Sequence, residues 1–213
     1  MEGIEYLPNG NLLISSGLYG SSFIREVTPQ GDVVTQRDLA SDLFGEGATR
    51  THTGTIWQLT YQENRALKYD EKLNFIEDVP YDTEGWGMCM YGDKVITSDG
   101  SDTLTVRNAD TLAPLRRVST DTRYLNELDC DTKNGRVLAN VFGTNSIIAI
   151  NPDTGDTLNE YRVDVPELDL KGDKVLNGIA ALPNGGDTYL ITGKQWPRAY
   201  TFSLPPSPRQ ESE

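Results

Sequence analysis

Five positions along the chain carry an acidic or amide side chain just ahead of an apolar, strand-like pattern. They recur at roughly 40 residues, which is the spacing of β-propeller blades. A radial repeat places equivalent positions around one axis, so we expect these side chains to meet at the mouth of a central channel. Carboxylates and amides gathered there could transfer protons or coordinate a hard cation such as calcium. The segments are Glu2-Gly3-Ile4, Glu46-Gly47-Ala48, Glu84-Gly85-Trp86, Asn126-Glu127-Leu128 and Asn177-Gly178-Ile179.

Each polar segment is followed by two further runs of strand length, rich in apolar and β-branched residues and separated by Asn, Gly and Pro turns. The second strands are expected at 12–14, 55–59, 94–97, 136–141 and 188–192, and the third strands at 23–27, 65–69, 103–107, 146–150 and 199–202. A fourth strand follows turns such as 28–32, and helix signals are nearly absent. The pattern predicts an all-β fold, a five-bladed β-propeller in one domain at 1–204. The proline-rich and charged segment 205–213 is expected to be disordered.

Charge and hydropathy exclude several classes of partner. The 213 residues include 19 Lys and Arg against 32 Asp and Glu, a net charge of -13. This charge repels phosphate backbones and anionic membranes, so no nucleic-acid partner is expected. No apolar run approaches the ~20 residues that span a bilayer, so no membrane partner is expected either. The start of the chain also lacks the charged and apolar regions of a secretion signal.

The two cysteines occupy nearly the same place in the third and fourth repeats, on what we interpret as neighbouring inner strands. Contact between Cys89 and Cys130 is conceivable, but we favour two buried thiols over a disulfide. His52, between two threonines, is expected at the surface. With one histidine and no Cys/His pairing, a zinc site built from soft ligands is not expected.

A second set of short motifs runs in order over almost the whole chain. They are Leu18-Tyr19-Gly20, Phe44-Gly45-Glu46-Gly47, Gln58-Leu59-Thr60, Glu84-Gly85-Trp86-Gly87, Ser98-Asp99-Gly100-Ser101, Leu125-Asn126-Glu127-Leu128, Asn151-Pro152-Asp153-Thr154-Gly155, Val175-Leu176-Asn177-Gly178-Ile179-Ala180, and Thr192-Gly193-Lys194 with Trp196-Pro197. Together they resemble the propeller-type glutaminyl-peptide cyclotransferases of plants and bacteria; each motif alone would be weak. The resemblance implies a five-bladed propeller.

The resemblance also implies an activity, an acyltransferase reaction that cyclises an amino-terminal glutamine to pyroglutamate with loss of ammonia. Its partner would be a peptide or protein with that terminus, and the scheme needs no metal or other cofactor. The resemblance further implies a secreted or periplasmic protein. We expect a monomer.

Two residues are implied as catalytic. Glu46, in the Phe-Gly-Glu-Gly motif, would accept and return the proton of the substrate amine, a role worth about 10²- to 10⁴-fold. Lys194 would hold the oxygen of the scissile carboxamide, where one preorganised donor contributes ~3 kcal/mol. The structural alternatives are that Glu46 satisfies the backbone amides of a turn and that Lys194 forms an ion pair with Asp99 or Glu84.

The remaining site residues are implied to bind the substrate. Phe44 would wall the pocket, Trp86 would form an aromatic floor, and Asn126 would bond to the glutamine amide. Trp86 could instead be a packing residue, and buried amides such as Asn126 and Asn177 often tie loops together.

Some positions depart from the family pattern. Tyr61 and Phe142 stand where the family usually has tryptophan, which keeps an aromatic wall but reduces its stacking area. Glu2 stands where glutamine is common and adds a carboxylate to the substrate pocket. Met1 falls inside the first family motif, and the strand that usually precedes it is absent. We therefore expect the last blade, around 178–204, to be short or open, because propellers commonly close by pairing an early strand there.

Two other functions fit the sequence. One is a propeller that binds a peptide end without turnover; the aromatic replacements and the missing start favour it, whereas Glu46, Trp86 and Lys194 argue against it. The other is a calcium-dependent, lactonase-like hydrolase whose oxygen ligands would be Glu2, Glu46, Glu84, Asn126 and Asn177. Lys194 in the same mouth opposes a cation there. Loss of activity with a chelator would favour the hydrolase.

Overall fold

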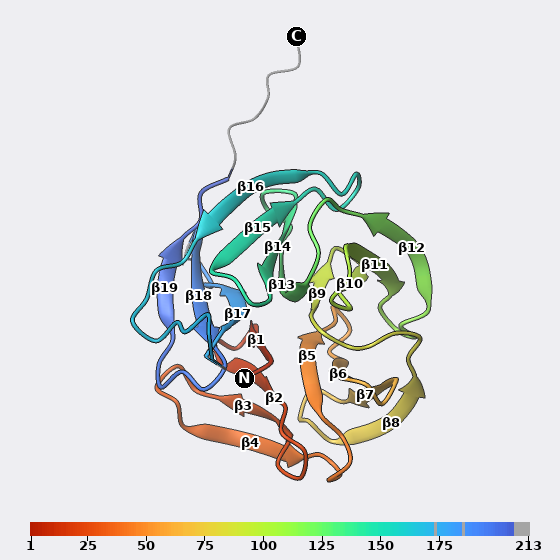
Figure 1. Cartoon of the computed structure of the whole chain (residues 1–213). Coiled ribbons are helices and arrows are strands. Elements are labelled where there is room, and N and C mark those ends of the chain that lie inside the picture. Colours follow the sequence, from red (N-terminus) through yellow and green to blue (C-terminus); the bar gives the residue numbers. More distant parts are fainter. Residues whose placement is uncertain (173, 185, 207–213) are drawn as a thin grey trace.

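Residues 1–172, 174–184 and 186–206 are described in the computed structural model, and they form five small antiparallel sheets with no helix among them. The sheets lie around one axis as the blades of a five-bladed β-propeller (Figure 1), which confirms the predicted fold. The first two blades contain β1 (Gly3–Tyr6), β2 (Leu12–Ser16), β3 (Phe23–Val27), β4 (Val33–Asp38), and β5 (Gly45–Arg50), β6 (Ile56–Thr60), β7 (Arg65–Tyr69), β8 (Phe75–Pro80). The third and fourth contain β9 (Met88–Tyr91), β10 (Lys94–Thr97), β11 (Thr103–Asn108), β12 (Pro114–Ser119), and β13 (Leu125–Asp131), β14 (Arg136–Val141), β15 (Ser146–Ile150), β16 (Thr157–Arg162). The fifth contains β17 (Leu176–Ala181), β18 (Thr188–Gly193) and β19 (Tyr200–Ser203).

The first strand of every blade lies next to the axis and contacts the first strands of both neighbouring blades. The contacts run from β1 to β5, β9, β13, β17 and back to β1, so the ring is closed at its centre. The outer strands β4, β8 and β16 are largely exposed. Exposure thus increases from the axis outward. The second strands and most third strands are largely buried and rich in apolar residues, which explains why they lie within two residues of their predicted bounds.

The core is divided among the spaces between blades. One such cluster, between blades four and five, contains Leu138, Ile147, Tyr189 and Ile191, all at most 1% exposed. Trp57 is fully buried between blades two and three, where its indole Nε1 donates to the carbonyl of Ala109 at 2.9 Å. Packing of neighbouring blades against each other therefore holds the inner strands, and their polar ends, at defined positions around the axis.

The fifth blade contains three strands where the others have four. The short last blade that the sequence predicted is therefore observed within the described residues. The chain that follows β19 is held at Pro205, whose carbonyl accepts a hydrogen bond from Arg136 Nη1 at 2.9 Å. Residues 207–213, where most of the predicted disorder falls, lie outside the described residues, and the domain limits 1–204 stay a prediction. His52 is exposed, as predicted.

None of the described segments forms a helix of the length and hydrophobicity that crossing a bilayer requires.

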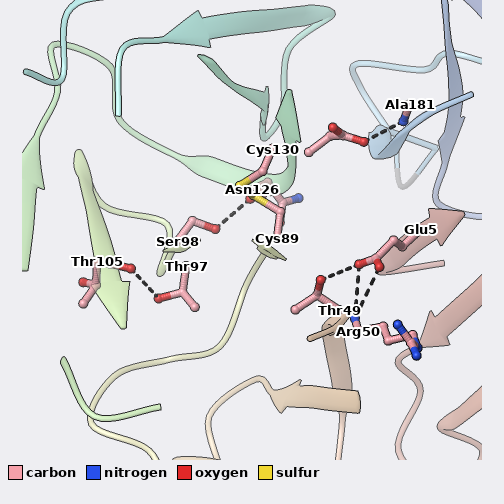
Figure 2. The surroundings of a disulfide bond; sticks show 11 residues. Glu5, Thr49, Arg50, Cys89, Thr97, Ser98, Thr105, Asn126, Cys130 and Ala181 are labelled. Carbon is pink, nitrogen blue, oxygen red and sulfur yellow. Dashed lines mark hydrogen bonds between the residues drawn. A yellow bond between two sulfur atoms is a disulfide. The ribbon is translucent and has the colours of Figure 1, made fainter. Parts of the chain in front are cut away.

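Cys89 and Cys130 form a disulfide, so the expectation of two free buried thiols is wrong. Cys89 lies on β9 and Cys130 on β13, the inner strands of adjacent blades (Figure 2). The sequence placed the two cysteines, 41 residues apart, on neighbouring inner strands but did not show how closely these strands approach. The closed ring of inner strands brings their Cα atoms to 5.4 Å, within the range that a disulfide requires.

Removing this disulfide should reduce stability without removing activity. A cross-link that closes a loop of 41 residues restricts the unfolded chain, which corresponds to about 4 kcal/mol in the chain-entropy description. We expect Cys89→Ala with Cys130→Ala to lower the free energy of unfolding by about 2–4 kcal/mol in urea titrations. An unchanged unfolding midpoint in the double variant would contradict this structural role.

Candidate active site

A local irregularity at the start of the inner strands turns polar side chains toward the channel mouth. In blades two, four and five, the pairing of the first strand with the second places two residues opposite one. Such bulges re-aim a side chain and are common beside functional sites. The doubled residues are Glu46-Gly47, Asn126-Glu127 and Asn177-Gly178.

Blade three follows the same geometry with a different residue at the mouth. Its first paired residue is Met88, so Trp86 and not Glu84 corresponds to Glu46. The glycine that follows Trp86 confirms this correspondence. A Cβ on Gly87 would lie 2.2 Å from the carbonyl oxygen of Asn126, the mouth residue of the next blade, just as a Cβ on Gly47 would lie 2.6 Å from the carbonyl oxygen of Trp86. The prediction that Glu84 belongs to the ring of mouth residues is therefore wrong. The segment contains glycine on both sides of Trp86, and only packing against the next blade shows which glycine is equivalent.

Glu84 instead lies beside the site, half-buried, and supports Trp86. One carboxylate oxygen accepts a hydrogen bond from Trp86 Nε1 at 3.1 Å, and the other accepts from Gln62 Nε2 at 3.0 Å. The five-oxygen ring proposed for a calcium site is consequently not formed, because an indole occupies one of its positions.

All eight predicted site residues lie at this mouth. A cavity of about 230 Å³ is lined by Tyr19, Phe44, Glu46, Tyr61, Trp86, Asn126, Phe142 and Lys194. Glu2 lines an adjoining hollow of about 580 Å³, which shares Phe44, Phe142 and Lys194 with the first. Tyr19 was not predicted as a site residue, although the Leu-Tyr-Gly motif that contains it was part of the family resemblance. The structure thus brings the predicted residues together, and their individual roles remain predictions.

The cavity has two aromatic walls. On one side, the Phe44 ring lies 5.3 Å from Tyr19 and 5.9 Å from Tyr61, measured between ring centroids. On the other side, Trp86 and Phe142 meet edge to face at 5.6 Å. These walls make a slot that suits the methylene groups of a short, polar-ended side chain.

A glycine lies behind the larger ring of the second wall. A Cβ on Gly100 would lie 2.5 Å from the Trp86 indole, and Gly100 has a φ of +78°. Gly100→Ala should therefore strain the backbone and push the indole into the cavity. We expect KM for substrate to rise about tenfold or more, while Gly20→Ala, with a similar φ and open space around it, should affect stability alone. An unchanged KM in Gly100→Ala would show that Trp86 does not form the binding wall.

Lys194 and Glu2 form an ion pair at the edge of the cavity. Lys194 Nζ lies 2.8 Å from Glu2 Oε2, and Asn177 Nδ2 donates to the same oxygen at 2.8 Å. The partner of Lys194 is thus Glu2, and neither Asp99 nor Glu84. Burial disfavours the charge of Lys194, but contact with Glu2, together with the nearby Glu46, outweighs burial and raises the pKa of the ammonium. Lys194 is therefore a cation at neutral pH.

Glu46 has no such partner and is held away from water. Burial first, and then the negative charge of Glu2, raise the pKa of the Glu46 carboxyl well above its usual value, while Lys194 acts in the opposite direction. Burial also raises the pKa of Glu2, and Lys194 opposes that rise. Because Lys194 and Asn177 bond directly to Glu2, the pair is best described as an ionised Glu2 beside a protonated Glu46. The mouth therefore contains a fixed cation and a neutral acid that can give up its proton.

Asn126 places a side-chain amide at the cavity that is free to bind substrate. Its backbone carbonyl accepts a hydrogen bond from Ser98 Oγ at 2.7 Å, which fixes the strand (Figure 2). Its side-chain amide makes no hydrogen bond to other described residues, so it can pair with a substrate carboxamide. Within the described part of the chain, no group of three or more His, Cys, Asp or Glu side chains has the arrangement of a metal site.

Comparison with known proteins agrees with these features. Residues 1–204 match the family model described as glutamine cyclotransferase. The chain is 31% identical over 217 aligned residues to the glutaminyl-peptide cyclotransferase of Arabidopsis thaliana, covering 95% of this chain and 66% of that protein. The chain thus spans about two thirds of the length of this relative.

Solved structures show the same relationship. The glutaminyl cyclase of Myxococcus xanthus superposes with a TM-score of 0.78 at 25% identity, covering 94% of this chain and 88% of that one. A streptogramin B lyase, at 14% identity and a TM-score of 0.57 over 96% of this chain and 68% of that one, shares the fold alone. With a family match over nearly the whole chain, this protein belongs to the glutamine cyclotransferase family.

Proposed function

We propose that this protein is a glutaminyl-peptide cyclotransferase, which converts an amino-terminal glutamine to pyroglutamate and releases ammonia. The observation that carries the proposal is that a buried carboxyl with a raised pKa, Glu46, and a cation, Lys194, line one aromatic-walled cavity of about 230 Å³. Ring closure is intramolecular, so a slot that holds the amine against its own side-chain carboxamide provides a large part of the rate enhancement. Membership of the family supports the same reaction.

Glu46 would move the proton. Because its carboxyl is protonated at rest, it first donates a proton to the amide nitrogen that leaves as ammonia. The carboxylate that results then takes a proton from the former α-amine, whose nitrogen has joined the ring. One C–N bond forms, one breaks, and the proton returns to Glu46, so the reaction is balanced for a substrate that binds as the free amine.

Lys194 would stabilise the oxygen of the tetrahedral intermediate. The ammonium is held by Glu2 on one side and faces the Phe142 ring, 5.7 Å from its centroid, on the other. A cation fixed in this way does not need to reorganise when negative charge develops on the substrate oxygen. Asn126 would bind the glutamine carboxamide, which disfavours substrates that lack one.

We also propose that the reaction is metal-independent. Lys194 occupies the position beside Glu2 that a cation would require, and Trp86 replaces the oxygen ligand that blade three would have to supply. Turnover that survives a chelator supports this proposal, and loss of turnover that added Ca²⁺ restores would return the hydrolase alternative.

An oxidising compartment is proposed for the protein in the cell. The support for it is the Cys89–Cys130 disulfide, since such bonds persist mainly in secreted and periplasmic proteins. Thiol labelling of the protein taken directly from its native compartment tests this, because a reduced pair would oppose the proposal.

The activity itself is tested with a short peptide that begins with glutamine. Ammonia release and the matching mass loss should both occur far faster than in buffer alone. A peptide with an acetylated terminus lacks the nucleophile, and one that begins with asparagine cannot close the same ring, so neither should react. If the glutamine peptide binds without reacting, the protein is a binding propeller; if it does neither, the proposed substrate is wrong.

A further inference from the structure

A layer of glycines lies directly below the residues of the channel mouth. In four of the five blades the residue that follows the mouth residue is glycine, namely Gly3, Gly47, Gly87 and Gly178. In the fourth blade that residue is Glu127. The inner strands approach too closely here for side chains: a Cβ on Gly47 would lie 2.6 Å from the carbonyl oxygen of Trp86. Beside two of these glycines, Gly3 and Gly47, the space is taken by the side chain of Glu127.

The Glu127 carboxyl lies against the two glycines that follow the acidic residues of the mouth. One oxygen, Oε1, is 3.1 Å from the point where a Cβ on Gly3 would stand, and Oε2 is 2.9 Å from the corresponding point on Gly47. These two glycines directly follow Glu2 and Glu46 in the sequence. Glu127 therefore reaches across the axis from β13 to the backbone that carries the two mouth carboxyls.

The Glu127 carboxyl is buried without a partner. Glu127 is 0% exposed, and neither oxygen has a hydrogen bond of ordinary geometry with the described residues. Even a neutral carboxyl that is buried without a hydrogen bond is more costly than a methionine or leucine of similar volume. A group retained at such a cost is a candidate for function.

The surroundings favour the protonated form of this carboxyl. Burial raises the pKa of Glu127 well above its usual value, and the charges of Glu46, Glu2 and Glu5 raise it further, while the Ile4 amide opposes the rise. Of these three carboxyl groups, Glu46 lies on β5, Glu5 lies on β1, and Glu2 directly precedes β1. A neutral carboxylic acid is also a hydrogen-bond donor, as the protonated acids of some oxyanion sites show.

We propose that Glu127 remains a neutral acid under the mouth and that its O–H group stabilises the negative charge that Glu46 carries during turnover. The inference rests on the proposed cyclotransferase reaction. Glu127 keeps its own proton throughout, so the O–H bond is not broken and the balance of the reaction is unchanged. It acts through Glu46 and does not touch the substrate, which makes it a positioning residue.

The test is a pH titration of the Glu46 carboxyl carbon by NMR, which needs no activity. Glu2, Lys194, Glu63 and the amino group of Met1 are the charged groups that act on Glu46, and none of them is substituted in the variants. Glu127→Met removes the donor at similar volume, so the pKa of Glu46 should rise by about one unit, which is tenfold in its ionisation constant. Glu127→Gln retains an N–H donor and should change it little.

The sign of the shift decides between the two charge states of Glu127. If Glu127 were an anion, both substitutions would remove a negative charge and lower the pKa of Glu46. A lowered pKa, or no change in Glu127→Met, would overturn the proposal. Asp129→Asn is the matched control, because Asp129 is a half-buried carboxyl of β13 that accepts a hydrogen bond from the Ala181 amide at 2.6 Å, and its substitution should leave Glu46 unaffected.

A second measurement requires no substitution at position 127. In the unaltered protein the carboxyl carbon of Glu127 should keep the chemical shift of a protonated acid throughout the pH range in which Glu46 ionises, above the ordinary range for glutamate. Ionisation within that range would overturn the inference even if Glu127→Met did not fold.

Kinetics then separate this role from general stability. We expect kcat of Glu127→Met to fall about tenfold with KM unchanged, and Glu127→Gln to retain most of kcat. A fall in both variants alike would contradict the donor role. If the unaltered protein does not cyclise glutamine, the proposed function fails, and the NMR titration still decides the state of Glu127.

Discussion

Replacing Glu46 by glutamine is expected to lower kcat by about 10²- to 10⁴-fold while leaving KM nearly unchanged. The amide fills the same space on β5 but cannot give a proton to the leaving nitrogen or take one from the ring nitrogen. The loss should therefore fall on the chemical step and not on binding. Single-turnover measurements of pyroglutamate formation test this directly.

The pH dependence of kcat provides a further signature of Glu46. Because its pKa is raised and the protonated form starts the reaction, kcat should be constant below that pKa and fall as pH rises through it. The residual activity of Glu46→Gln should lack this decline. Glu26→Gln is a suitable control, since Glu26 is also buried but accepts hydrogen bonds from Asn9 and Asn11 away from the mouth.

The stability of Glu46→Gln should change in the direction opposite to its activity. Burial raises the folded-state pKa of Glu46 above its unfolded value, so the folded protein binds a proton that the unfolded chain releases. This contribution is fully present below the unfolded pKa of about 4.3 and is lost as pH rises through the folded value. Glu46→Gln should thus unfold at a higher temperature than the unaltered protein at alkaline pH, with little difference near pH 4. A fall in stability at both pH values would indicate misfolding as the cause of lost activity.

The second large effect is expected for Lys194→Met, in which kcat should fall by about 10²- to 10³-fold. Methionine retains much of the lysine stem but removes the cation that faces the substrate oxygen. It also leaves Glu2 buried, with Asn177 as its remaining hydrogen-bond donor, so the pKa of Glu2 should rise and the carboxyl should become neutral.

A double variant separates the two consequences of losing Lys194. Glu2→Gln combined with Lys194→Met removes a buried carboxylate that has lost its lysine and keeps only the Met1 amino group, 3.9 Å away, as a cationic partner. The double variant should therefore recover stability lost in Lys194→Met alone. It should not recover kcat, because the cation is still absent. Recovery of kcat in the double variant would show that Lys194 acts only as the counter-ion of Glu2.

The strand order and blade number were predictable from the sequence because they depend on local signals. Alternating apolar residues and Asn-Gly turns mark the strands in each repeat, and the position of the second and third strands in the middle of the four-stranded blades makes their patterns strong. The prediction was weakest at the first strand of each blade, where bulges and glycines interrupt the alternation. This is where Glu84 was assigned in place of Trp86.

Family motifs identified most of the site residues but not how they pair. Glu2 and Lys194 stand at opposite ends of the sequence, and no local pattern shows that their side chains meet at 2.8 Å. The Cys89–Cys130 bond was not predicted, because placing the cysteines on neighbouring inner strands does not show that their Cα atoms come within 5.4 Å. Glu127 attracted no attention as an isolated residue, since its significance comes from its position against Gly3 and Gly47 of two other blades.

The sequence by itself determined the repeat, the all-β class, the family and the residue types at the mouth, because these follow from periodicity and from motifs that keep their order along the chain. Only the tertiary structure decided which charges face each other, which cysteines bond and which carboxyl is left without a partner. The physical reason is that a closed ring brings residues from distant repeats to one axis, where burial and the sum of nearby charges set each protonation state.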